Sequence, residues 1–280
     1  MISYLILFIS VFLVATLSIA SYSDIKTREV PDFISYMLIC GGLLLSLILA
    51  VDNNSIANLE FMPLSIGVLF GFSYLMYRTG QWAGGDVKLM LGLSVIFTSF
   101  SMSSSFSFIN LFINILIFGG VYGLLGTIVF GLIKFKHMRK FLHLYDVGLV
   151  AGGAVLIFVF IDFLPLPVNY LAAFAAFMLI SMRYIYVVAE NLMFVNVRVD
   201  KLTEGDWLVA DAVDSSGKTI VDRKNTGLET SDIKKLKESS IKQVLVKIGL
   251  PFVPGLLIGT IVTLVFWNPI LQLITSNLIL

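Results

Sequence analysis

One uncharged stretch near the middle of the chain decides the class of fold. Residues 108–133 read FINLFINILIFGGVYGLLGTIVFGLI and contain no Asp, Glu, Lys or Arg. A helix of roughly 17–25 apolar residues is long enough to cross the ~30 Å hydrocarbon core of a bilayer. Residues 108–133 are therefore expected to form a transmembrane helix.

The whole chain shares this apolar character. Of its 280 residues, 58% are hydrophobic and 13% are charged, whereas soluble domains carry about 25% charged residues. Such an excess cannot be buried in one soluble core. Seven further apolar stretches are expected to cross the membrane: Ile2–Tyr22, Ile34–Val51, Pro63–Tyr77, Val87–Met102, Val147–Phe163, Val168–Met182 and Pro251–Ile274. The predicted fold is an all-α polytopic membrane helix bundle of about eight spans.

The basic residues predict the orientation of these spans. All 19 Lys and Arg side chains fall in alternate connections, and the connections around Asp52–Glu60, Ser103–Ser107 and Asp162–Pro167 contain none. Cytoplasmic loops carry the excess of Lys and Arg in membrane proteins. Both termini are therefore expected outside and the basic loops in the cytoplasm. Because these charges follow topology, they indicate a lipid bilayer as partner and give no sign of nucleic-acid binding.

One polar segment interrupts the apolar pattern. We expect residues 1–189 to form the membrane bundle with spans one to seven, residues 190–249 a small cytoplasmic α+β insert, and residues 250–280 the last transmembrane helix. The elements expected in the insert are a strand at Val195–Val199, a hairpin of Trp207–Ala210 with Thr219–Val221 around the turn Asp214–Gly217, a helix capped by Thr230 or Ser231 and ending at Glu238, and a strand at Gln243–Lys247.

The sequence offers few ligands for a metal ion. Cys40 is the single cysteine, and the two histidines, His137 and His143, lie in one basic loop. A multi-cysteine zinc site is excluded. We expect no metal and no cofactor.

Two aspartates stand out because ionisable residues at membrane depth are costly. From Ile2 to Asp24 a helix rises about 33 Å, so Asp24 lies at the cytoplasmic end of the first span. Asp86 opens the fourth span after Ala83, Gly84 and Gly85. The glycines loosen the backbone and leave room for another chain. Both carboxylates are thus expected at one depth, on one side, and close together if the two spans are neighbours.

A pair of close carboxylates suits an aspartyl protease. Mutual repulsion separates their pKa values, so that the pair holds one proton. The deprotonated member can then activate water while the protonated member polarises the scissile carbonyl. Taken singly, Asp24 could simply pair with Arg28 and Asp86 could simply cap its helix. Their common depth favours the catalytic interpretation. Asp146, after Tyr145, is expected only to cap the sixth span.

These residues resemble the archaeal prepilin and preflagellin peptidases, membrane aspartyl proteases with a Gly-x-Gly-Asp motif. The resemblance rests on Asp24 with its basic, Val-Pro-Asp tail and on Gly84-Gly85-Asp86-Val87-Lys88; residues 247–254 also look like the carboxy-terminal domain of some archaeal members. It implies that Asp24 and Asp86 are catalytic and that the substrates are precursors with a short basic leader, cut at the cytoplasmic membrane face. Ala83 stands where the motif has its first glycine, which is expected to alter loop flexibility without loss of activity.

Lys88 and two other functions complete the expectations. Lys88 is expected to extend to the interface, or to contact substrate or tune the two aspartates. A proton- or cation-coupled transporter using Asp24 and Asp86 is the alternative function. Such transporters bind near the midplane, whereas these aspartates lie at the edge. A scaffold that binds partners through the insert is the third possibility.

Overall fold

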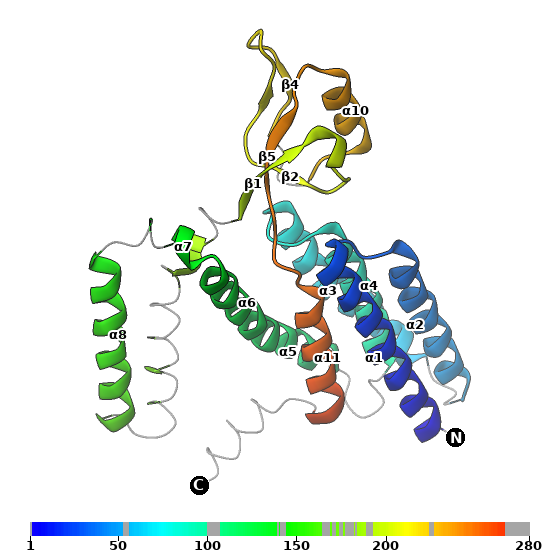
Figure 1. Cartoon of the computed structure of the whole chain (residues 1–280). Coiled ribbons are helices and arrows are strands. Elements are labelled where there is room, and N and C mark those ends of the chain that lie inside the picture. The colour runs from blue at the N-terminus through cyan, green and yellow to red at the C-terminus, as the bar shows by residue number, and fades with distance from the viewer. Residues whose placement is uncertain are drawn as a thin grey trace.

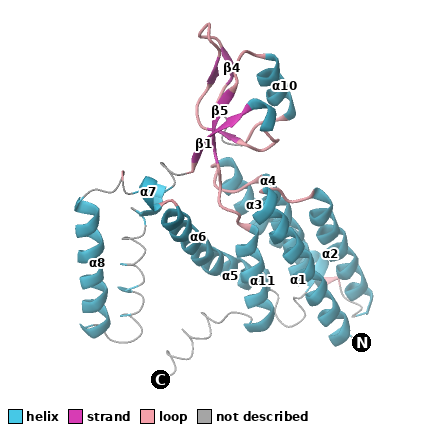
Figure 2. Cartoon of the chain, in the orientation of Figure 1, coloured by secondary structure: helices cyan, strands magenta, loops and turns pink. Residues whose placement is uncertain are grey.

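The computed structural model describes most of the chain as helices with one small group of strands (Figure 1). The residues that it describes are 2–52, 56–99, 107–138, 140, 144–163, 169, 172, 173, 176, 182, 184–188, 193–223 and 227–266. Figure 2 shows that the strands are confined to the insert, which lies at one end of the helices.

The amino-terminal half of the chain forms a layer of long helices. These are α1 (Ile2–Thr27), α2 (Asp32–Asp52), α3 (Ala57–Arg78) and α4 (Gly84–Ser99). A further helical segment consists of α5 (Ser107–Asn114), a π-helical turn η2 (Ile115–Gly119) and α6 (Gly120–Ile133). The short α7 (Phe135–Met138), α8 (Leu144–Phe163) and α11 (Val253–Phe266) complete the described helices outside the insert.

Four described segments are long and apolar enough to cross a membrane. They are Leu7–Thr27, Asp32–Asp52, Leu59–Arg78 and Ser107–Ile133, and shorter apolar helices lie at Gly148–Val159 and Val253–Phe266. The expectation of a mostly helical membrane protein is confirmed. The total of about eight spans stays a prediction, because the expected span Val168–Met182 lies largely outside the described residues.

Several described helices extend beyond the expected apolar stretches, and two of them extend by about five residues or more. The first helix continues past Tyr22 to Thr27, which places Asp24 in its last turns. The third begins at Ala57 rather than at Pro63, which lies inside the helix. A proline lacks the N–H that bonds four residues back and usually disfavours a helix interior, so the apolar run gave the wrong start.

The packing of the helices explains how distant segments meet. Helix α4 packs mainly on α2 and α3, whereas α11, from the other end of the chain, packs on α1, α5 and η2. One buried cluster joins the two groups, and it contains Leu17, Leu89, Phe97, Ile115 and Leu256. Burial of these side chains is the main source of contact between the start and the end of the chain.

Glycines allow α11 to lie very close to η2. A Cβ atom on Gly255 would lie 3.1 Å from the Gly119 Cα, and one on Gly259 would lie 2.7 Å from the Ile115 Cα. Small residues at such positions let helix backbones approach in lipid. Four-residue glycine spacing elsewhere does not mark a contact: a Cβ on Gly67, Gly71, Gly148 or Gly152 would meet no described atom within 4 Å.

The insert contains a three-stranded sheet, a separate hairpin and one helix. Its elements are β1 (Phe194–Arg198), the 3-10 turn η3 (Val199–Lys201), β2 (Trp207–Leu208), β3 (Ala212–Val213), β4 (Thr219–Val221), α10 (Thr230–Glu238) and β5 (Gln243–Lys247). The sheet order is β1-β5-β2 with antiparallel pairs, and β3 pairs with β4. Leu208, Leu228, Leu236 and Val246 belong to its own small core.

The structure corrects two details of the expected insert. Trp207–Leu208 pairs with β5, so the hairpin around Asp214–Gly217 consists of Ala212–Val213 and Thr219–Val221. The cap of α10 is Glu229, not Thr230 or Ser231. Glu229 and Asp232 form a reciprocal capping box, in which each side chain bonds the other residue's backbone N–H. The expected strand at Gln243–Lys247 has the observed bounds.

Candidate active site

Helix α1 ends in a turn that fixes the position of Asp24. Arg28 adopts a left-handed backbone with φ of 61°, and its N–H donates to the Asp24 carbonyl at 3.0 Å. This is the single hydrogen bond of a left-handed C-terminal cap. The Ser23 hydroxyl donates to the Glu29 carbonyl at 2.8 Å and holds the turn from the other side.

Helix α4 begins with Asp86 folded back on its own first turn. The Ala83 N–H donates to Asp86 Oδ2 at 3.0 Å, and the Asp86 N–H donates to the Ala83 carbonyl at 3.1 Å. An acidic side chain at the third helical position satisfies a free N–H of the helix start in this way. The capping role considered from the sequence is therefore present, and it fixes the orientation of the carboxylate.

The turn after α1 lies across the first turn of α4. A Cβ atom on Gly85 would lie 3.0 Å from the Val30 Cβ, so this turn can approach only because residue 85 has no side chain. Lys88 Nζ donates to Asp32 Oδ1 at 2.6 Å. Both members of this ion pair are about half exposed, so it contributes roughly 0.2–1 kcal/mol. Lys88 therefore links α4 to the start of α2.

A third element reaches the site from the far end of the chain. The Val253 N–H donates to Asp24 Oδ2 at 3.0 Å, a buried hydrogen bond between residues 229 positions apart. Beside it, the Phe252 ring lies on the Trp82 ring, with centroids 4.7 Å apart. The start of α11 thus touches both the end of α1 and the loop that leads to Asp86.

Together these contacts bring the two aspartates into one buried site. Asp24 is 8% exposed and Asp86 is 5% exposed. The two carboxyl groups lie within range of electrostatic interaction with each other. The Tyr122 hydroxyl, from α6, lies within the same range of Asp24 and Arg28. Convergence of the two carboxylates was expected from their common depth, and here the turn after α1 and the start of α11 connect Asp24 to the first turn of α4 and the loop before it.

The site is open on the side of the motif loop. Ala83 and Gly84 are exposed, and a Cβ on Gly84 would meet only a Tyr77 ring atom, at 3.9 Å. The insert lies at this end of the helices (Figure 1). The buried carboxyl pair therefore lies next to an exposed loop of small residues.

The remaining candidate residues lie elsewhere. Asp146 is buried in the first turn of α8, and Figure 1 shows α8 apart from α1 and α4. Among the described residues, no three His, Cys, Asp or Glu side chains are grouped so that they could hold a metal ion.

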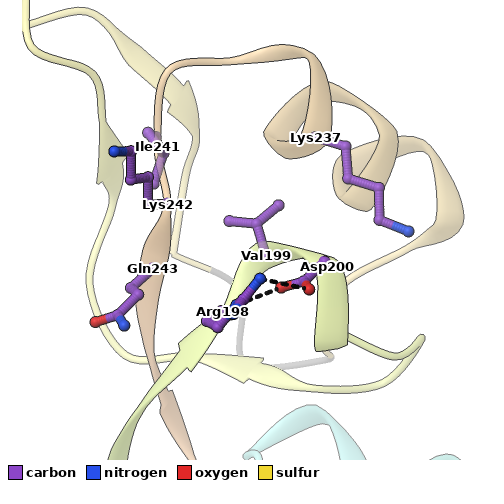
Figure 3. A pocket seen from close by; sticks show the side chains of 7 residues that line it. All are labelled: Arg198, Val199, Asp200, Lys237, Ile241, Lys242 and Gln243. Atoms are coloured by element: carbon purple, nitrogen blue, oxygen red, sulfur yellow. Dashed lines mark hydrogen bonds and ion pairs between the residues drawn. The ribbon is translucent and has the colours of Figure 1, made fainter.

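A separate pocket of about 460 Å³ lies on the insert (Figure 3). It is lined by Arg198, Val199, Asp200, Lys237, Ile241, Lys242 and Gln243. Arg198 forms two hydrogen bonds of 3.0 Å with Asp200, which lower the pKa of that carboxyl. None of the residues that surround Asp24 and Asp86 lines this pocket, so it is no part of the carboxyl site.

Sequence reasoning missed the contributions of α11 and α6. A backbone N–H has no signature in a sequence, and Val253 is an ordinary apolar residue at the start of an apolar run. Tyr122 is one tyrosine within a long apolar helix. Residues 247–254 stood out in the sequence only through their resemblance to the carboxy-terminal domain of some archaeal members, which does not indicate a contact with Asp24.

Comparison with known proteins connects this site to a family of peptidases. Residues 11–124, which include Asp24 and Asp86, match the type IV leader peptidase family. The chain is 31% identical over 91 residues to the prepilin peptidase EppA of Methanothermobacter thermautotrophicus, and the aligned segment covers 32% of this chain and 24% of that relative. The chain thus spans about a quarter of the length of the curated relative that it matches. No solved structure matches the chain. The resemblance expected from the sequence is confirmed by these two matches: over residues 11–124, the chain is similar to the type IV leader peptidase family.

Proposed function

We propose that this protein is a membrane aspartyl endopeptidase in which Asp24 and Asp86 are the catalytic pair. The proposal rests on two buried carboxyl groups that interact electrostatically with each other. They belong to two different helices, and both lie inside the segment that matches the family. Ala83, Gly84 and Gly85 form the loop that shapes the site.

The chemistry follows from a pair that shares one proton. The deprotonated carboxylate takes a proton from water, and the water oxygen attacks the carbonyl carbon of the scissile peptide. The protonated carboxyl donates to the carbonyl oxygen as negative charge develops there. The carboxyl group that took the proton from water then donates it to the leaving nitrogen as the C–N bond breaks, and the other carboxylate takes back a proton from the collapsing diol, which restores the pair. Two carboxyl groups with different proton affinities supply both functions.

The proposed substrates are type IV prepilin-like or preflagellin precursors. The match of residues 11–124 to the type IV leader peptidase family supports a leader peptide as the segment removed, and the relative is named a prepilin peptidase. The one-sided Lys and Arg distribution supports a site at the cytoplasmic face, where a short basic leader precedes an apolar membrane helix. Residues 190–249 are proposed to form a cytoplasmic domain above this site.

The test is cleavage by the purified protein in proteoliposomes. A prepilin-like precursor with a basic leader and an apolar helix is added, and mass spectrometry locates the cut. The proposal requires a single cut between leader and helix. A matched precursor whose leader lysines and arginines are replaced by glutamine should be cut more slowly. An intact precursor after exposure to well-folded protein would contradict the proposal.

The transporter alternative predicts a different result in this experiment. It requires proton or cation flux across the same proteoliposomes without added peptide. Both carboxylates lie at helix ends, Asp24 near the end of α1 and Asp86 at the start of α4, whereas transporter sites lie near the midplane. The described geometry therefore favours the peptidase.

A further inference from the structure

The start of α11 lies outside the family-matched segment, yet it contacts the carboxyl site. The match covers residues 11–124, whereas the donor to Asp24 is residue 253. Val253 is fully buried, and the Phe252 N–H also interacts with the same carboxylate. Two successive N–H groups at a helix start form a natural cradle for a negative charge.

We infer that the first turn of α11 is a positioning element of the active site: the Val253 N–H orients the Asp24 carboxylate, and the Phe252 ring holds this turn against the Trp82 loop. The inference rests on the proposed function, which assigns Asp24 to catalysis.

Contacts on two sides keep this turn from moving independently of the site. The Phe252 and Trp82 rings are in contact, and Trp82 is followed by Ala83, whose N–H bonds Asp86. On its other side, Gly255 lies against the Gly119 backbone. The turn is therefore packed between η2 and the motif loop while its N–H is directed at Asp24. The proline at 254 has no N–H to compete with that of Val253.

The first turn of α11 follows the insert closely in the chain. Strand β5 ends at Lys247, and the Ile248 N–H donates to the Met193 carbonyl at 2.8 Å, which continues the ladder with β1 toward the helices. Leu250 then packs on the buried Val187 and Val188. Residues 248–252 thus connect the insert to the turn that contacts the Asp24 carboxylate. A hydrogen bond at Ile248 and the packing of Leu250 hold this connection in place.

Replacement of Val253 by proline isolates the hydrogen bond. Proline is well tolerated at the first position of a helix, and it removes the N–H that Asp24 accepts. Val253→Ala is the matched control, because it removes more of the buried side chain and keeps the N–H. A hydrogen bond to a charged group contributes about 1.5–3 kcal/mol, so kcat for leader cleavage should fall about 10- to 100-fold in Val253→Pro. Val253→Ala keeps the N–H that Asp24 accepts, so its kcat should fall less than that of Val253→Pro.

An infrared readout separates this inference from the proposed function. The Asp24 carboxyl band is identified by its loss in Asp24→Asn, and no cleavage is needed to record it. The band should shift in Val253→Pro and keep its position in Val253→Ala. If Val253→Pro fails to fold, an amide-to-ester replacement at Val253 removes the same N–H and keeps the side chain.

The result that overturns the inference is an unshifted Asp24 band together with a kcat equal to that of Val253→Ala. If the parent protein cuts no precursor while the Asp24 band shifts in Val253→Pro, the proposed function is contradicted and the positioning role of α11 remains supported.

Discussion

Gly84 and Gly85 are adjacent in the chain but have different surroundings. Gly84 is exposed and nearly free of neighbours, whereas the position of a Cβ on Gly85 lies 3.0 Å from the Val30 Cβ and 3.2 Å from its Cγ2. The second glycine is therefore required by packing against the turn after α1. The first serves only to leave space for another chain.

Gly85→Ala should displace the Val30 turn and with it the two aspartates. A catalytic group moved by about 1 Å loses up to about 100-fold in rate, so kcat for leader cleavage should fall about 10- to 100-fold. Val30→Gly in the same protein removes both the Cβ and the Cγ2 that the new side chain would meet, so it should restore most of the rate, which a double-mutant cycle measures. Gly84→Ala is the control and should stay within about threefold of the parent. Equal losses in both single variants would show that the Val30 contact does not matter.

At the scale of elements, the contact between α11 and η2 is one of the close helix contacts in the described chain that depend on a glycine. Gly259 lies against the Ile115 backbone, and the buried Asn114 amide donates to the Thr263 hydroxyl at 3.0 Å. A π-helical turn widens the local backbone and often occurs at functional sites. In this chain the π-helical turn is η2, and it packs on α11, whose first turn contacts Asp24.

Gly259→Ala should separate these helices. Its Cβ would lie 2.7 Å from the Ile115 Cα, which is backbone and cannot rotate away. Such overpacking costs about 1–3 kcal/mol of the free energy of unfolding, so the unfolding temperature in detergent should fall. Gly71→Ala, in α3 with no described atom within 4 Å of its Cβ, should leave it unchanged or slightly higher. A Gly259→Ala protein as stable as Gly71→Ala would refute the close contact.

The sequence predicted the positions of the helices and strands better than it predicted which of them pair or pack together. The apolar runs predicted where the helices lie. Asp24 and Asp86 stood out because they are ionisable residues at the ends of these runs. The period-two pattern at Val195–Val199 located β1 (Phe194–Arg198) to within one residue, but a strand pattern does not specify which strand pairs with it. Trp207–Leu208 was therefore assigned to the wrong hairpin. The Val253 donor could not be predicted, because its role depends on packing between residues 229 positions apart.

At the scale of the whole molecule, the direction of the helices sets which face carries the site. In Figure 1, α1 begins at the end of the bundle opposite the insert. If the Lys and Arg pattern determines orientation, the insert and the carboxyl pair face the cytoplasm together. Asp52, at the far end of α2, should then face the outside.

Cysteine labelling in intact cells tests this orientation. The exposed Cys40 is first changed to Ser. An impermeant thiol reagent should then label Asp52→Cys in intact cells and Ser215→Cys, on the exposed hairpin of the insert, only after lysis. Labelling of Ser215→Cys from outside, with Asp52→Cys protected, would place the site on the wrong face for leader cleavage.

The most direct test of the central claim is cleavage by Asp24→Asn, Asp86→Asn and the double variant, with exposed Asp52→Asn as the matched control. Residues that act as one catalytic unit are strongly non-additive. Each single variant should therefore lose leader cleavage as completely as the double variant, while Asp52→Asn retains the parent rate and all four proteins remain folded in the membrane. Appreciable turnover by either single variant, or a further loss in the double variant, would contradict the account.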